Sequence, residues 1–324
     1  MAIVTADKGL VTVFGGAGFV GRHVVRALLK RGWRVRAAVR RPDLAGHLQP
    51  LGMVGWVQPV QANLRYRWSV DRAVIGADAV VNLVAVLNER GRQRFDAVNV
   101  FGARAVAEAT RAAGTPRFIH MSAMGADPKA PSALMRSKAE GESAAFETRP
   151  DAIVFRPSLQ FGPEDQVFNK FAALARIMPV LPLAGASTRF QQVFAGDVAK
   201  AVADAVDGYV KGGKVYELGG PEIVTLRQCM EMVLATIERR RLILPIPNWL
   251  ARIEAAILQI LPNPILTLDQ VAELTADHVV SEAAAMEGRT LSGLGIEATS
   301  LEAILPSYLY RFRARGQFDR ARPA

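Results

Sequence analysis

Three glycines near the start of the chain have a spacing that suits phosphate binding. Gly15, Gly18 and Gly21 stand three residues apart. Gly15 permits a tight turn, Gly18 leaves room for a pyrophosphate to approach the backbone, and Gly21 lets a following helix lie close to a preceding strand. The free N–H groups and the positive dipole end of that helix would hold the anion. The spacing predicts a dinucleotide site, although a glycine-rich turn that binds nothing would contain the same residues.

The elements expected around these glycines fit such a site. Residues 10–14 form an apolar run rich in β-formers, which predicts a buried strand, and residues 19–29 predict a helix. Strand, turn and helix together make the phosphate-binding start of a Rossmann domain. We expect the residues of the turn and of the first helical turn to contact the nucleotide, namely Gly15, Ala17, Gly18, Phe19 and Val20.

Strand and helix patterns alternate up to about residue 160, which predicts an α/β fold with a doubly wound parallel Rossmann sheet. Further strands are expected at 33–39, 54–60, 79–86 and 117–121, and a long helix at 95–113. We therefore predict a nucleotide-binding domain over residues 1–160 and a smaller, mostly helical C-terminal domain over 161–324. The second domain should be interleaved with the first, because elements from about 190–218 are expected to return to the sheet.

The second predicted strand ends in Arg40-Arg41-Pro42. An acid at this place would bind the ribose 2′-hydroxyl of NAD, whereas an arginine suits the 2′-phosphate of NADP. A guanidinium also matches a phosphate with forked donors and keeps its charge. We therefore predict NADPH as the cofactor, with Arg40 and Arg41 as its phosphate ligands. An exposed arginine pair ahead of a helix is the alternative.

The GxxGxxG spacing resembles the extended and atypical members of the short-chain dehydrogenase/reductase superfamily. That resemblance implies further cofactor contacts where the predicted strands end. Many relatives carry Asp at the adenine contact near Asn63, and an amide can still donate and accept there. The implied contacts are Asn63, Leu64, Val84, Ala85, Val86, Met121 and Ser122.

Members of that superfamily transfer protons with a Tyr-x-x-x-Lys motif, in which the lysine lowers the pKa of the phenol and holds the ribose. This chain has Ser122 at the serine position and Lys138 on the lysine helix, but Leu134 stands where the tyrosine belongs. Leucine has no exchangeable proton, and no tyrosine of the chain lies on this helix. We therefore expect Lys138 to bind the cofactor and assign no catalytic residue. An exposed helix lysine is the alternative for Lys138.

The second half of the chain resembles a narrower family, the short-chain-dehydrogenase-like accessory subunit of respiratory complex I (NADH:ubiquinone oxidoreductase) in its bacterial form. The resemblance covers residues 8–318. The motifs that carry it are Phe155-Arg156-Pro157-Ser158, Phe161-Gly162-Pro163-Glu164-Asp165, Leu181-Pro182-Leu183, Gln191-Gln192-Val193, Gly196-Asp197-Val198-Ala199, Tyr216-Glu217-Leu218-Gly219-Gly220-Pro221, Leu266-Thr267-Leu268-Asp269-Gln270-Val271, Leu294-Gly295-Ile296 and Leu305-Pro306-Ser307-Tyr308-Leu309-Tyr310.

This family resemblance implies a tightly held NADPH, no known turnover, and a place on the peripheral arm near the membrane. It also implies that a loop after the sixth strand closes over the nicotinamide, with contacts from Pro157, Ser158 and Leu159. The expected partners are other complex I subunits of the peripheral arm and membrane interface, together with anionic lipid headgroups. The expected location is the cytoplasmic face of the bacterial inner membrane, and no homo-oligomer is expected.

Composition narrows the classes of function. The 324 residues carry a formal charge of +10, which suits an acidic partner or an anionic membrane surface, although a solvated arginine surface would give the same balance. The single cysteine, Cys229, excludes an internal disulfide, and the four histidines are scattered, so no metal site is expected. Aromatic and basic residues do not interleave as in single-strand binders, so no nucleic acid is expected. The first residues resemble no signal peptide.

The most apolar stretch is residues 242–268, where four prolines and two charged residues argue against a membrane-spanning helix. Asn248 predicts the start of a helix that reaches about residue 261. Its apolar face comprises Leu250, Ile253, Ile257 and Ile260. This face could be buried in the second domain. It could instead rest on lipid or on a membrane subunit, with help from Trp249 and the basic run at 239–241.

Three hypotheses follow from the sequence. The first is a non-catalytic, NADPH-containing accessory subunit of complex I. The second is an active NADPH-dependent reductase or epimerase, against which Leu134 argues. The third is an NADP-sensing regulator, against which the C-terminal motifs and the apolar 242–268 stretch argue.

Overall fold

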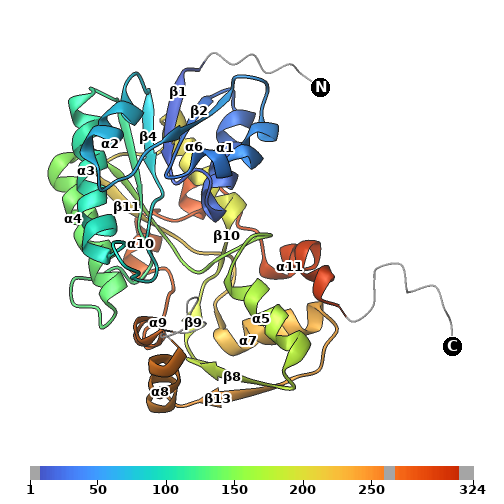
Figure 1. Cartoon of the computed structure of the whole chain (residues 1–324). Coiled ribbons are helices and arrows are strands. Elements are labelled where there is room, and N and C mark those ends of the chain that lie inside the picture. The colour runs from blue at the N-terminus through green and yellow to red at the C-terminus, as the bar shows by residue number, and fades with distance from the viewer. Residues whose placement is uncertain (1–7, 259–266, 314–324) are drawn as a thin grey trace. The chain divides into compact units, whose positions relative to one another are not determined.

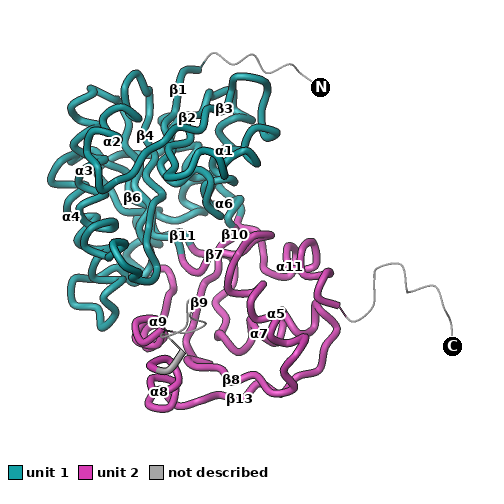
Figure 2. Tube along the Cα trace, viewed as in Figure 1, with its two compact units in different colours: residues 1–157, 195–218, 281–297 teal, residues 158–194, 219–280, 298–324 magenta. Residues whose placement is uncertain are grey.

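The computed structural model describes residues 8–258 and 267–313 (Figure 1). The chain forms two compact units, each built from separate stretches of sequence (Figure 2). Unit 1 comprises residues 1–157, 195–218 and 281–297, and unit 2 comprises 158–194, 219–280 and 298–324. The chain therefore leaves unit 1 and returns to it twice.

Unit 1 contains a seven-stranded sheet whose paired strands all run parallel, in the order β11-β6-β5-β4-β1-β2-β3. The strands are β1 (Leu10–Phe14), β2 (Arg34–Val39), β3 (Val57–Gln61), β4 (Ala79–Asn82), β5 (Arg117–Met121), β6 (Ile153–Pro157) and β11 (Lys214–Leu218). The central strands are apolar and buried, as both faces of a parallel sheet require. The predicted doubly wound Rossmann fold is confirmed.

Helices cover both faces of this sheet. On one face, α1 (Phe19–Lys30) packs against α6 (Ala195–Asp207). On the other lie α2 (Arg67–Val74), α3 (Phe101–Ala112) and α4 (Ala133–Thr148), packed in that order (Figure 1). Shorter pieces are 3₁₀ turns at Pro42–Leu44, Gly46–Leu51 and Ser292–Leu294, a π-helical turn at Asp96–Val100, and α10 (Glu282–Met286).

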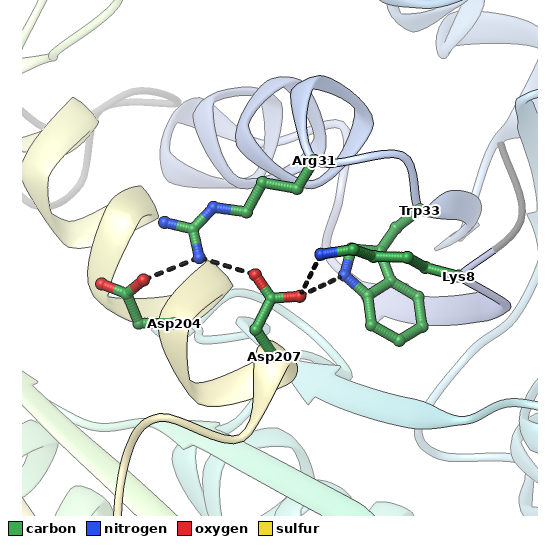
Figure 3. Close-up of polar contacts among 5 residues, drawn as sticks. All are labelled: Lys8, Arg31, Trp33, Asp204 and Asp207. Atoms are coloured by element: carbon green, nitrogen blue, oxygen red, sulfur yellow. Dashed lines mark hydrogen bonds and ion pairs between the residues drawn. The ribbon is translucent and has the colours of Figure 1, made fainter. Parts of the chain in front are cut away.

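A polar cluster joins α1 to α6 although these helices are far apart in sequence (Figure 3). Arg31 at the end of α1 donates to Asp204 at 2.7 Å and to Asp207 at 2.9 Å. The Trp33 indole donates to Asp207 at 2.8 Å, and the Lys8 ammonium lies 3.1 Å from the same carboxylate. Hydrogen bonds from Trp33, Arg31 and Lys8 outweigh the effect of burial, so the pKa of Asp207 lies below its ordinary value. The cluster attaches the returning segment 195–207 to the first helix.

Two expected elements of unit 1 differ in extent. The strand predicted over 79–86 ends at Asn82, whose side-chain oxygen accepts the backbone N–H of Val84 at 3.2 Å and so replaces a sheet partner. The helix predicted over 95–113 begins as a π-helical turn and becomes α-helical only at Phe101. At β4 a side-chain hydrogen bond takes the place of a pattern that hydrophobicity alone would continue.

Unit 2 is smaller and mainly helical. Its core gathers α5 (Val167–Ile177), α7 (Leu226–Thr236) and α11 (Leu301–Leu309) around buried aromatic and aliphatic side chains such as Phe161, Phe168 and Leu305. Three strand pairs complete it: β7 (Gln160–Phe161) with β10 (Val193–Phe194), β9 (Arg189–Phe190) with β12 (Val224–Thr225), and β8 (Val180–Ala184) with β13 (Leu242–Ile246). The remaining elements are α8 (Asn248–Leu258), α9 (Leu268–Glu273) and a 3₁₀ turn at Tyr310–Phe312.

The helix predicted from Asn248 is present, but the face that it buries is not the one that the apolar pattern predicts. Ala251 and Ala255 are fully buried, packed with Ala184 and Val271. Leu250 and Ile253, which the apolar pattern placed on a common face, are 39% and 51% exposed. The side chains at 257 and 260 and the predicted end of the helix lie outside the described residues. Small residues form the inner face of α8, and burial of Leu250 and Ile253 is therefore the wrong expectation.

No helix within residues 8–258 and 267–313 is long and apolar enough to cross a bilayer.

Candidate functional site

The glycine turn after β1 has the geometry that phosphate binding needs. Gly15 has a φ of +80°, a conformation that favours glycine, and its N–H donates to Ala38 O at 3.0 Å. A Cβ on Gly21 would lie 2.2 Å from Gly15 O, so α1 can start here only with glycine at that position. Gly18 is exposed, and the first turn of α1 has neither a capping side chain nor an acidic residue. Its N–H groups are thus open to an anion.

The two arginines after β2 are not equivalent. Arg41 lies 2.6 Å from Asp43, and the hydrogen bonds between them lower the pKa of this carboxyl. Arg40 is exposed, and within the described part of the chain its guanidinium forms no hydrogen bond or ion pair. Arg40 is therefore the cation that can turn to a 2′-phosphate without breaking an existing contact.

Asn63 and Leu64 follow β3. The Asn63 side-chain oxygen accepts the N–H of Arg65 at 3.2 Å and closes a turn. Leu64 is 5% exposed and lies against the start of α3, where a Cβ on Gly102 would come within 2.9 Å of it. The side chain of Asn63 thus shapes the loop and leaves its amide N–H groups for another acceptor.

The loop after β4 lies directly against the glycine turn, because a Cβ on Gly15 would be 3.3 Å from both Cγ2 and N of Val84. Asn99 fixes this loop: its oxygen accepts the Val86 N–H at 2.9 Å, and its amide donates to Val86 O at 3.2 Å and to Ser137 Oγ at 3.0 Å. Asn99 thereby connects the loop of residues 84–86 to helix α4.

Lys138 and Ser122 are buried polar groups with little to satisfy them. The Lys138 ammonium donates to Met121 O at 3.3 Å. Burial lowers the pKa of Lys138 to about 8 from 10.5, and the charge of Glu142, itself 2.6 Å from Arg156, opposes part of that change. Ser122 is 3% exposed, and its hydroxyl has no partner among the described residues. A buried ammonium with one printed hydrogen bond and a buried hydroxyl with none are costly, so these two indicate a place for a polar ligand.

The sequence relationships agree with this geometry. A family described as NAD(P)H-binding matches residues 15–152. The mitochondrial NADH dehydrogenase (ubiquinone) 1 alpha subcomplex subunit 9 of Arabidopsis thaliana is 34% identical over 289 residues, which cover 85% of this chain and 72% of that protein. The chain belongs to this subunit 9 family of NADH dehydrogenase. The NADH-ubiquinone oxidoreductase 40 kDa subunit of Neurospora crassa is 29% identical over 95% of the chain and 80% of its own length.

A reductase is also among the relatives of this subunit 9 family member. The ceramide reductase of Caulobacter vibrioides is 36% identical over 197 residues, 61% of each chain. Solved structures show a like fold at lower identity. The NADPH-dependent quinone oxidoreductase QOR2 of Escherichia coli, complexed with NADPH, has a TM-score of 0.69 at 21% identity over 93% of this chain and 99% of its own. The Bordetella bronchiseptica enzyme WbmH, in complex with NAD+, has a TM-score of 0.69 at 18% identity over 95% and 99%.

In this subunit 9 family member Leu134, the residue expected at the tyrosine position, is buried among apolar side chains. Leu134 is 3% exposed and clusters with Phe95 and Met135, with Val86 and Ala123 packed against them. His120, on strand β5, is a further buried polar residue. Burial and the charge of Lys138 lower its pKa to about 3, and its Nδ1 lies 3.2 Å from the Asn82 amide, which donates to it.

The remaining predicted contacts fall in both units. Pro157 belongs to unit 1, where its carbonyl accepts the N–H of Met124 at 2.9 Å. Ser158 and Leu159 belong to unit 2, where the Ser158 hydroxyl donates to His278 O at 2.7 Å and Leu159 O accepts the N–H of Val193 at 3.0 Å. Contact of these three residues with a nucleotide stays a prediction.

Three residues around the site were not assigned a role from the sequence: Asn82, Asn99 and His120. Each is a polar residue flanked by apolar neighbours, and all three are buried. A single polar residue among apolar neighbours was the sequence feature that could have identified them. In the described part of the chain, no three His, Cys, Asp or Glu side chains gather closely enough to bind a metal ion.

Proposed function

We propose that this chain holds NADPH as a structural component of respiratory complex I and does not turn it over. One observation carries the proposal: the chain keeps Lys138 and Ser122 as buried polar groups, with Lys138 donating to Met121 O next to Ser122, while a buried leucine, Leu134, stands four residues before Lys138. A site that retains the groups for binding and loses the group for proton transfer is expected to bind and not to react.

The preference for NADPH is supported by Arg40. Its guanidinium stands at the end of β2 without a partner in the described chain, and no acid occupies that position to bind a ribose hydroxyl. Arg41 would join only if the phosphate displaced Asp43. When bound, NADPH would offer a 2′-phosphate to Arg40, a pyrophosphate to the N-terminus of α1 and a ribose to Lys138.

A nucleotide bound only by the folded chain adds its binding free energy to folding stability. We propose that this stabilises the subunit and, through it, the peripheral arm of the complex near the membrane. The partners would be other complex I subunits, and the location the cytoplasmic face of a bacterial inner membrane. The membership of the Arabidopsis and Neurospora relatives in NADH dehydrogenase supports this assignment, and anionic lipid headgroups are proposed as further contacts.

The test is gentle solubilisation of the membranes followed by a native gel. We expect the chain to migrate with NADH:quinone activity and, once purified and denatured, to release close to one NADPH per chain. A chain that migrates alone, or that releases no nucleotide, would contradict the proposal.

A second candidate is a reductase that acts on an apolar ketone. It is favoured by the 36% identity to a ceramide reductase and by the retained Ser122 and Lys138. A lysine with a pKa of about 8 could donate the proton that Leu134 cannot. NADPH oxidation that depends on a long-chain ketone, and is lost in Lys138→Met, would establish this function in place of the first.

A further inference from the structure

The motif at residues 155–158 places an arginine on β6, in the middle of the parallel sheet. The guanidinium of Arg156 meets the carboxylate of Glu142 on α4 through two hydrogen bonds: Nε donates to Oε1 at 2.8 Å, and Nη2 donates to Oε2 at 2.6 Å. The side chain of Glu142 is 6% exposed and that of Arg156 is 25% exposed. Bidentate, charge-assisted pairs of this kind are among the stronger polar contacts in proteins. Each oxygen of the Glu142 carboxylate therefore accepts from one and the same guanidinium.

A second cation, Lys138, stands four residues before Glu142 on α4. Side chains at this spacing are neighbours on the surface of a helix. Burial lowers the pKa of Lys138, and the charge of Glu142 opposes part of that change, so the two groups interact. Within the described part of the chain, however, no ion pair joins them, and the Lys138 ammonium donates only to Met121 O at 3.3 Å. The buried carboxylate has two cations nearby and is paired with Arg156 alone.

The other charges around α4 do not compete for Lys138. His120 on β5 is neutral at physiological pH, because burial and the charge of Lys138 lower its pKa to about 3. The charges of Glu217 on β11 and Asp127 after β5 act on Arg156 and help to keep it in place. The elements packed against α4 contribute charged side chains that are paired with one another, namely Arg104 with Glu147, Arg67 with Glu108 and Arg94 with Asp96.

We propose that Arg156 is a positioning residue for Lys138: by holding both oxygens of Glu142, it keeps the Lys138 ammonium free for the hydroxyl oxygens of a ligand. Without the charge of Arg156, the buried carboxylate would be uncompensated, which is strongly unfavourable. Lys138 is the neighbouring cation that could turn to it, and its donors would then serve the chain itself. That the ligand is the ribose of NADPH rests on the proposed function, whereas the effect of Arg156 on Lys138 does not.

The test follows the titration of Lys138 in the full-length, nucleotide-free chain. Lysine labelled with ¹³C at Cε gives one NMR signal per lysine, and the signal that is missing in Lys138→Met identifies Lys138. We expect a midpoint near pH 8 in the unchanged chain. Arg156→Gln removes the charge and should raise this midpoint by at least about one unit, since an opposite charge nearby typically shifts a pKa by about one to three units. Arg156→Lys keeps the charge and should leave the midpoint near pH 8.

Two controls separate this charge effect from a general loosening of α4. Arg104→Met breaks an ion pair with Glu147 on the same helix and should leave the Lys138 midpoint unchanged. Arg156→Gln combined with Glu142→Gln removes the whole ion pair, so no buried carboxylate is left to attract Lys138, and the midpoint should stay near that of the unchanged chain. Urea unfolding checks that each variant folds, and the double variant still decides the matter if Arg156→Gln alone does not fold.

The proposal is overturned if Arg156→Gln and Arg156→Lys titrate alike. It is also overturned if the midpoint of the double variant falls by more than about one unit, because Glu142 would then already be the counter-ion of Lys138. The affinity for NADPH tests the ligand separately: it should fall about tenfold in Arg156→Gln and be retained in Arg156→Lys. A raised Lys138 midpoint with unchanged NADPH affinity would support the role of Arg156 and refute Lys138 as the nucleotide ligand of the proposed function.

Discussion

In the proposed function, single side chains decide which nucleotide the chain binds and whether it reacts. The sequence identified Lys138 because it matches the lysine of a known motif, Leu134 because it departs from that motif, and Arg40 because an arginine after the second strand suits a 2′-phosphate. It could not separate Arg40 from Arg41, since the pairing of Arg41 with Asp43 is a matter of side-chain geometry. It also gave no role to Asn99, whose hydrogen bonds join residues that are far apart in sequence.

Replacing Arg40 by Asp should weaken NADPH binding by about ten- to a hundredfold, because a charge-assisted contact is lost and a like charge faces the 2′-phosphate. NADH, which lacks that phosphate, should bind nearly unchanged. Nucleotide titration followed by fluorescence measures both. Arg26→Asp makes the same charge change at an exposed position on α1 and should have little effect. Equal NADPH affinity in Arg40→Asp would refute the assignment of the 2′-phosphate.

Lys138 should make the free energy of unfolding of the nucleotide-free protein rise with pH between about 8 and 10.5. Its folded pKa, about 8, lies below the unfolded value of 10.5, so between these values the unfolded chain binds the proton and the folded chain does not. The cost of the buried charge is thus fully present below pH 8 and disappears as the pH rises to 10.5. Lys138→Met should raise the free energy of unfolding by up to roughly 3 kcal/mol at neutral pH, with the gain shrinking across that window. Urea unfolding measures it.

Lys129→Met, at an exposed lysine, is the control for that series and should show no such pH dependence. A Lys138→Met gain that is constant up to pH 10.5 would mean that the ammonium carries no buried-charge penalty. With NADPH present, Lys138→Met should instead be less stable than the unchanged chain, because the variant lacks a proposed ligand of the nucleotide.

Helices and strands were the most predictable part of the fold. Strand β1 and the start of α1 lie where the apolar pattern and the glycines placed them. Errors arose where a side chain overrides the local pattern. Asn82 ends β4 early, and α8 packs through alanines that a hydrophobicity pattern ranks below Leu250 and Ile253. Which apolar stripe of a helix turns inward depends on the partner surface, which local sequence does not specify.

The glycines of the phosphate turn should have separable roles. Gly21→Ala places a methyl group 2.2 Å from Gly15 O, so α1 must shift and the free energy of unfolding should fall by about 2 kcal/mol or more. Gly46→Ala, with no atom within 4 Å, should change stability little. Thermal and urea unfolding compare them. Equal stability of Gly21→Ala and Gly46→Ala would mean that α1 does not approach the turn closely.

Gly18→Val instead acts on the ligand, because Gly18 is exposed. It should abolish NADPH retention while the apo chain stays folded. In membranes, the amount of this chain recovered with complex I should fall, with NADH-to-quinone activity falling alongside it and flavin-site activity per remaining complex unchanged. Full recovery of a nucleotide-free chain in an active complex would show that NADPH is dispensable for assembly.

At the scale of the molecule, the chain leaves unit 1 twice, and the segments 195–218 and 281–297 return to it. The sequence indicated that 190–218 would contribute to the sheet, but not that 281–297 also joins unit 1. There Arg289 donates to Val215 O at 2.6 Å and its carbonyl accepts the N–H of Glu217 at 2.9 Å, beside the edge strand β11. A short helix with weak patterning gives no local signal of the strand it lies against.

The Arg31–Asp207 cluster should stabilise the attachment of α6 to α1 at neutral pH and lose this effect in acid. Asp207→Asn should lower the free energy of unfolding by about 1–3 kcal/mol at neutral pH, since it weakens hydrogen bonds to Arg31, Lys8 and Trp33. The pKa of Asp207 is lowered by folding, so this stability is present above its unfolded pKa of 3.8 and is lost as the pH falls through the folded value. The difference in the free energy of unfolding between Asp207→Asn and the unchanged chain should therefore disappear as the pH falls from neutral to acid.

Asp43→Asn is the control for that variant, because the exposed Arg41–Asp43 pair should contribute little to stability. Asp207→Asn curves that run parallel to those of the unchanged chain at all pH values would show that the cluster does not depend on the ionised carboxylate.

The return of β11 to the sheet has a consequence for synthesis. When the ribosome has released β6, one edge of that strand is unpaired, and its partner β11 is separated from it by the whole 158–194 stretch and by α6. At translation rates of about 5–20 residues per second, the nascent sheet would wait roughly 3 to 12 seconds for that partner. An unpaired apolar edge is a template for wrong pairing. The nascent chain is therefore expected to need a holding chaperone in this interval. Slower codons after residue 157 would lengthen the time for which the edge of β6 is unpaired.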